Sequence, residues 1–179
     1  PSGIAILNGR EESRRKLDDF YYKRPDASPR LSMTTFCDVP LHPDLKGLPK
    51  MPRSAVLVID VQIGLVTGAY AESAVIKAIN RTISKVRESA GVVVFIQHCH
   101  SSFEPLMKGN AGWSLHPDLN RSPEDLQIEK EASDSFYETQ LDDLLTDNGV
   151  DHVYVTGLQT EFCVDTTCRA ALSRGYSVT

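Results

Sequence analysis

No apolar run in this sequence of 179 residues approaches the roughly 20 residues that a membrane-spanning helix needs. Cysteine is also scarce: the four thiols, Cys37, Cys99, Cys163 and Cys168, are irregularly spaced, and no secretory signal pattern accompanies them. This spacing favours free thiols in a reducing compartment over a disulfide framework. We therefore expect a cytoplasmic protein that has no membrane partner.

A basic surface is missing from the main part of the chain. The net charge is −5, and residues 54–179 contain seventeen Asp and Glu but only nine Lys and Arg. Nucleic-acid binding requires a basic face that neutralises phosphates. We therefore expect no nucleic-acid partner.

The glycine motifs of nucleotide enzymes are absent as well. Neither G-x-G-x-x-G nor G-x-x-x-x-G-K-[ST] occurs, and the G-x-S-x-G elbow of serine hydrolases is also missing. These absences argue against a nucleotide-dependent dehydrogenase, a kinase and a serine hydrolase of that type. We expect no cofactor.

What the sequence does contain is an alternation of strand and helix patterns after a proline-rich beginning. Residues 1–53 are punctuated by Pro25, Pro29, Pro40, Pro43, Pro49 and Pro52, which predicts a poorly ordered N-terminal extension. Strand patterns cover residues 55–59, 92–97, 128–132, 153–156 and 176–179, and helical patterns cover residues 72–89, 139–147 and 162–174. This alternation predicts one α/β domain over residues 54–179, a three-layer, doubly wound, Rossmann-like sheet of mostly parallel strands.

In such a sheet ligands bind beyond the carboxyl ends of the strands, which singles out three positions. Asp60 follows the first buried strand, His98 follows the second, and Cys163 begins a helix after the third clear strand and a tight turn. The N-terminus of that helix favours the nucleophilic thiolate of Cys163, and a carboxylate at a buried strand end suggests a general base. From position alone, a buried structural cysteine and a loop-anchoring or helix-capping aspartate are equally reasonable.

Lys130 and the histidines are weaker signals. Lys130 stands between two glutamates, which alone is typical of a solvated charge cluster, although a lysine could also pair with Asp60 or stabilise transition-state charge. His98 and His100 form a His-x-His pair of the kind that can bind metal at a strand end. No Asp or Glu stands at a convincing spacing nearby, so we expect no metal site.

Three segments together resemble the cysteine hydrolases of the isochorismatase-like superfamily. They are residues 56–62 (VLVIDVQ), Glu129-Lys130 followed by Ser135-Phe136, and residues 157–171 (GLQTEFCVDTTCRAA). The last segment is long and specific, whereas the first two are supportive. The resemblance covers about residues 54–179. It implies an isochorismatase-like hydrolase fold that is C-terminally incomplete, because family domains continue with another helix and strand.

Carried over by position, the resemblance implies a catalytic triad of Asp60, Lys130 and Cys163. It also implies a non-proline cis peptide at Leu158–Gln159, which would aim the backbone N–H groups of Gln159 and Cys163 at the developing oxyanion. In the implied mechanism Asp60 takes the thiol proton, the thiolate attacks a carbonyl carbon, and water hydrolyses the resulting thioester without a cofactor. The residues expected to line the substrate pocket are Gln62, His98, Trp113 and Phe136.

The resemblance thus implies an amidohydrolase that cleaves a small-molecule, non-peptide C–N bond, and a homo-oligomer, either a dimer or a tetramer. Nicotinamidases of this superfamily carry a metal site of Asp and His residues after the second strand, and residues 97–101 (QHCHS) lack that pattern. Two alternatives stay open. One is isochorismatase-type hydrolysis of another bond, although true isochorismatases lack the cysteine. The other is a catalytically inactive member that binds a ligand or a partner.

Overall fold

The computed structural model describes residues 53–179, and its centre is a sheet of five parallel strands. The strands are β1 (Arg53–Ile59), β2 (Val92–His98), β3 (Leu126–Lys130), β4 (Val150–Gly157) and β5 (Ser177–Val178), and their order in the sheet is β3-β2-β1-β4-β5. This arrangement confirms the predicted parallel α/β fold. The predicted N-terminal extension lies outside the described residues, except for Arg53, which begins β1.

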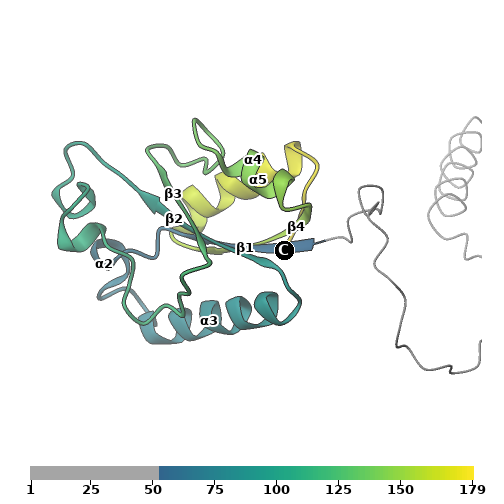
Figure 1. The fold of residues 1–179 in the computed structure, drawn as a ribbon. Coiled ribbons are helices and arrows are strands. Elements are labelled where there is room, and N and C mark those ends of the chain that lie inside the picture. The colour runs from purple at the N-terminus through teal and green to yellow at the C-terminus, as the bar shows by residue number, and fades with distance from the viewer. Residues whose placement is uncertain (1–52) are drawn as a thin grey trace, which may run out of the picture. The chain divides into compact units, whose positions relative to one another are not determined.

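Helices cover both faces of the sheet and complete the three layers (Figure 1). α3 (Glu72–Glu88) lies on one face, and α4 (Leu141–Asp147) and α5 (Asp165–Ser173) lie on the other. Shorter turns occupy the connections: α2 (Ile63–Val66), η2 (Glu104–Leu106), η3 (Ala111–Trp113) and η4 (Thr160–Val164). Within residues 53–179, none of these helices is long and apolar enough to cross a bilayer.

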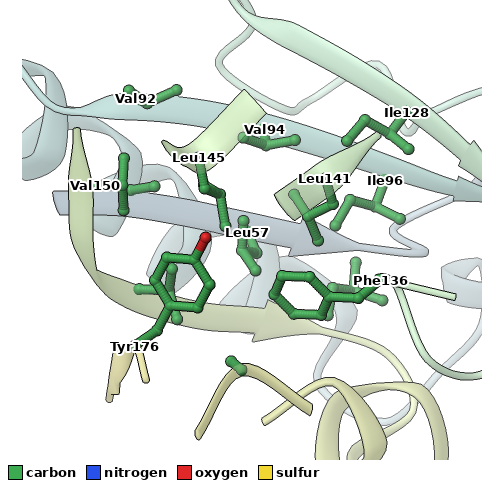
Figure 2. Close-up of a cluster of buried hydrophobic side chains, with 14 residues drawn as sticks. Leu57, Val92, Val94, Ile96, Ile128, Phe136, Leu141, Leu145, Val150 and Tyr176 are labelled. Carbon is green, nitrogen blue, oxygen red and sulfur yellow. The ribbon is translucent and has the colours of Figure 1, made fainter. Parts of the chain in front are cut away.

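The central strands are uniformly apolar because both of their faces are buried. Residues 55–59 of β1 have no exposed surface. On the face toward α4 and α5, Leu57, Val94 and Ile96 pack with Leu141 and Leu145 (Figure 2). On the opposite face the strands meet the apolar side of α3, whose buried residues recur with helical spacing at Ile76, Ile79, Ile83 and Val86.

Two differences from the sequence pattern lie at the carboxyl edge of the sheet. The strand predicted over residues 128–132 ends at Lys130, so this lysine closes β3. The helix predicted over residues 162–174 is split: a π-helical turn, η4, precedes α5 and contains Cys163. Wider turns of this kind are found often at functional sites, because they re-aim side chains that a regular helix would place elsewhere.

The strand order has a switch point between β1 and β4, because the chain builds outward from β1 on one side and then returns to its other side. Crevices at such points are the usual ligand sites of doubly wound sheets. Here Gly157 lets the chain leaving β4 pass close over the end of β1. Its φ is +119°, and an added Cβ would lie 1.9 Å from the Ile59 carbonyl oxygen. Only glycine fits this approach, which brings the turn before Cys163 beside Asp60.

Candidate active site

Asp60 and Lys130 form a buried ion pair at the carboxyl ends of β1 and β3. Lys130 Nζ lies 2.9 Å from Asp60 Oδ2, and the exposed fractions of the two side chains are 0% and 2%. Asp60 has a φ of 54°, a left-handed conformation that aspartate tolerates better than most residues. The resemblance named both residues, and the structure brings them into direct contact across seventy positions of sequence.

The Lys130 ammonium has a partner for each of its three hydrogens. Besides Asp60 Oδ2, Nζ donates to the Ala132 carbonyl at 3.0 Å and lies 3.2 Å from His98 Nδ1. A buried cation is costly unless it is paired and hydrogen-bonded, and this environment provides both. The ammonium is therefore fixed in place as a charge beside the carboxylate.

The second carboxylate oxygen of Asp60 is different. Oδ1 is buried and has no hydrogen-bond partner among the described residues. Cys163 Sγ, a carboxylate oxygen of Asp60 and a ring nitrogen of His98 lie within 4.8 Å of one another. Asp60 thus has one oxygen held by Lys130 and another without a partner among the described residues, and the Cys163 thiol lies close to the carboxylate.

The surroundings of Cys163 favour the protonated thiol, because they raise its pKa. Burial raises its pKa above the ordinary value, the neighbouring carboxylate of Asp60 raises the pKa further, and Lys130 opposes both effects. The thiolate that the helix N-terminus predicted is therefore not favoured in the resting site. A thiol in such surroundings requires a neighbouring base before it can act as a nucleophile.

His98 contacts the ion pair through Lys130. Its side chain is half-buried, and its ring stacks on that of His100 with the centroids 6.3 Å apart. Burial lowers the pKa of His98, the Lys130 charge lowers it further, and Asp60 opposes these effects. A neutral imidazole can accept the hydrogen bond from the Lys130 ammonium. Sequence position indicated a substrate contact for His98, and the contact with Lys130 could not be read from it.

Gln62 is fully buried and binds backbone. Its side-chain amide donates to the carbonyls of His98 and Trp113 at 3.0 and 2.8 Å, and its oxygen accepts the His98 N–H at 2.8 Å. Gln97 donates to the same Trp113 carbonyl. These bonds attach the loop that follows β2 to the ends of β1 and β2. The structure therefore does not bring the Gln62 side chain to a surface that a ligand could reach.

The other two predicted pocket residues, Trp113 and Phe136, contact different parts of the fold. The indole N–H of Trp113 donates to Cys99 Sγ at 3.2 Å, so this ring packs beside the end of β2. Phe136 is only 5% exposed, belongs to the core under α4 and α5, and stacks on Tyr176. Cys163 packs against the same core cluster as Phe136, whereas Trp113 contacts the residue that follows β2.

The turn between β4 and Cys163 has the backbone that the resemblance implied. The peptide bond between Leu158 and Gln159 is cis, and the Leu158 N–H donates to the Ile59 carbonyl at 2.9 Å. The Gln159 carbonyl in turn accepts the N–H groups of Phe162 and Val164. The turn is thereby fixed at both ends, against β1 and against η4.

Ser135 and Thr167 are positioning residues whose pairing sequence reasoning missed. Both are fully buried, and their hydroxyl oxygens lie 2.8 Å apart. Thr167 also accepts the Ser135 N–H at 3.1 Å. The pair joins the loop after Lys130 to α5, the helix that follows Cys163. The helical pattern placed Thr167 on the buried face, but nothing in it identified a partner.

A cavity of about 500 Å³ opens beside the carboxyl end of β3. It is lined by Cys99, Glu129, Lys130, Glu131, Ala132, Tyr137 and Glu138. Its three glutamates make it acidic, and it borders the triad from the side of Lys130. Neither Asp60 nor Cys163 lines it.

Comparison with known proteins agrees with this geometry. The isochorismatase domain model matches residues 54–179. Streptothricin hydrolase of Streptomyces noursei is 35% identical over 130 residues, 71% of this chain and 52% of that protein. The solved structure of an isochorismatase family protein is 36% identical with a TM-score of 0.64, covering 70% of this chain and 75% of that one. N-carbamoylsarcosine amidase from Thermoplasma acidophilum is 29% identical with a TM-score of 0.63, covering 70% and 79%.

The chain spans about half the length of the two streptothricin hydrolases that it matches. The family match nevertheless covers the parallel sheet together with all three residues of the buried site. The chain therefore belongs to the isochorismatase family.

Proposed function

We propose that the chain is the hydrolase domain of a cysteine amidohydrolase that cleaves a small-molecule, non-peptide amide through a thioester. One observation carries the proposal: a buried carboxylate beside a cysteine thiol has one oxygen paired with a lysine, and its other oxygen has no partner within residues 53–179. The names of two relatives, streptothricin hydrolase and N-carbamoylsarcosine amidase, support the same reaction class.

The reaction begins with proton transfer from Cys163 Sγ to the free oxygen of Asp60. The sulfur then bonds to the amide carbonyl carbon, and the carbonyl oxygen becomes an oxyanion beside the backbone N–H groups of Gln159 and Cys163. Lys130 keeps the local charge balanced, because its ammonium stays paired with Asp60 while the thiolate forms.

Collapse of the tetrahedral adduct breaks the C–N bond. Asp60 returns its proton to the nitrogen, so ammonia or an amine leaves and a thioester remains on Cys163. A water molecule, deprotonated by Asp60, then attacks the thioester carbon, and the departing sulfur recovers the proton. The net change is addition of water across one C–N bond, and the three side chains end as they began.

A panel of amides with matched cysteine variants tests the proposal. The panel contains streptothricin, N-carbamoylsarcosine and simple carboxamides, and isochorismate serves as the non-amide comparison. We expect hydrolysis of at least one amide by the wild type and by Cys168→Ser, and none by Cys163→Ala. Mass spectrometry after rapid acid quench should detect an acyl adduct on Cys163. Hydrolysis of isochorismate that survives Cys163→Ala would favour the vinyl-ether alternative, and loss of every activity would favour a binding role.

A further inference from the structure

We propose that the same carboxyl edge of the sheet is a binding site for a zinc-like divalent cation, held by Asp60, His98 and Cys163, and that the bound cation blocks the hydrolase. One ligand atom from each of these residues lies within 4.8 Å of the other two. Oxygen, imidazole nitrogen and thiolate sulfur are the donors that Zn²⁺ takes in proteins. Bonds of about 2.0–2.3 Å require donors roughly 3.3–3.7 Å apart, so the side chains would have to close by at most about 1.5 Å.

The unpartnered oxygen of Asp60 is the second observation that indicates a ligand. Asp60 is 1% exposed, and Oδ1 has no hydrogen-bond partner among the described residues. Buried acceptors without a partner are uncommon, and each one calls for an explanation. A cation can bind Oδ1 without displacing Lys130, which holds the other oxygen at 2.9 Å.

Lys130 keeps two of its three partners when His98 turns toward a cation. Its ammonium is 3.2 Å from His98 Nδ1, but it also donates to Asp60 Oδ2 and to the Ala132 carbonyl. Loss of the histidine contact therefore leaves two of its three hydrogen bonds. The net charge of the site, with a carboxylate, a thiolate, an ammonium and a divalent ion, is about one positive unit, which water in the fourth coordination position can solvate.

The tertiary structure supplies the carboxylate that the sequence around the His-x-His pair lacks. Asp60 stands 38 positions before His98 and reaches it because β1 and β2 are adjacent parallel strands. His100 is not part of the set, because its Nδ1 accepts the N–H groups of Ser102 and Phe103. The inferred ligands therefore differ from a local His-x-His site.

Binding of the ion breaks the S–H bond of Cys163 and releases its proton to solvent. Bonds to Asp60, His98 and the sulfur form, and no group is oxidised or reduced. The nucleophile and its base are then both occupied, so hydrolysis stops. The inhibition of hydrolysis by the ion rests on the proposed function, whereas the binding of the ion does not. Mg²⁺ and Ca²⁺ prefer sites made only of oxygen, so we expect them to bind far more weakly.

Cobalt spectroscopy tests binding directly on the whole chain. Co²⁺ is titrated at neutral pH, and a near-ultraviolet band from the thiolate–cobalt bond reports whether sulfur is a ligand. We expect one Co²⁺ per chain, displaced by Zn²⁺ but not by Mg²⁺. Cys163→Ser should abolish the band, and His98→Gln should weaken binding at least tenfold. The neighbouring controls, Cys99→Ser and His100→Gln, should bind as the wild type does.

Several results would overturn the proposal. The first is the absence of the band in the wild type, and the second is its survival in Cys163→Ser. The third is its loss in either control, because that loss would place the ion on the adjacent Cys99 and His100. Circular dichroism establishes whether each variant is folded. If His98→Gln does not fold, Cys163→Ser decides the test, because serine is nearly the same size as cysteine. Cobalt binding without hydrolysis of any amide in EDTA contradicts only the proposed function. Amide hydrolysis that persists in saturating Zn²⁺ overturns the block.

Discussion

Replacing Lys130 by methionine should destabilise the domain strongly. The same replacement of an exposed lysine should change the free energy of unfolding little. The substitution keeps the aliphatic stem but leaves the Asp60 carboxylate buried, with neither oxygen hydrogen-bonded to a cation. Removing one partner of a buried ion pair costs about 3–5 kcal/mol, because the other charge stays desolvated. With an m-value of about 2 kcal/mol/M, the midpoint of urea unfolding should fall by about 2 M.

Two variants make this experiment decisive. Lys108→Met removes another lysine near the end of β3, whose ammonium lies 2.6 Å from Glu129 in an exposed pair. It should leave the midpoint unchanged within error, because solvent screens such pairs. The double variant Asp60→Asn with Lys130→Met should cost less than the sum of its two single changes, because no unpaired charge remains. The reasoning would be refuted by a Lys130→Met midpoint within 0.5 M of wild type, an approximate threshold set by the same m-value.

Three further predictions follow from the contacts of the site. Asp60→Asn should move the pH midpoint of Cys163 alkylation by iodoacetamide downward, because the Asp60 charge raises the pKa of this thiol and Lys130 lowers it; an upward shift would contradict this reading. Gly157→Ala should cost more than about 2 kcal/mol in urea unfolding, because φ is +119° and its Cβ would lie 1.9 Å from a backbone oxygen of β1; a neutral result would disprove the close approach. Gln62→Leu should lower the free energy of unfolding by about 1–3 kcal/mol for each backbone group left unpaired. It should also shift the fluorescence of Trp113, the single tryptophan, because the Gln62 side chain binds the Trp113 carbonyl. An unchanged emission spectrum would argue against this anchor.

Much of the fold could be predicted because its determinants are local. Each strand of the sheet was found near its predicted position, since two-sided burial requires an uninterrupted apolar run such as residues 55–59. The helical period of α3 was equally plain. The start of α5 could not be predicted as well, because a π-helical turn leaves no signature in the spacing of apolar residues.

The sequence by itself determined that Asp60, His98 and Cys163 would meet at one edge of the sheet, because parallel strands end on the same side. It also contained the alternation of Ile128, Glu129 and Lys130, in which the outer two residues are buried and the middle one is exposed. In a short charged segment that alternation is too weak to identify Lys130 as a buried residue.

Only the tertiary structure decided what these side chains do. It gave Lys130 a carboxylate, an imidazole and a carbonyl as partners, and it left one oxygen of Asp60 without a hydrogen-bond partner among the described residues. It also raised the pKa of Cys163, which its position at a helix start had predicted to be low. Pairing, desolvation and charge depend on distances of a few ångströms between distant segments, and no local pattern in a sequence fixes such distances.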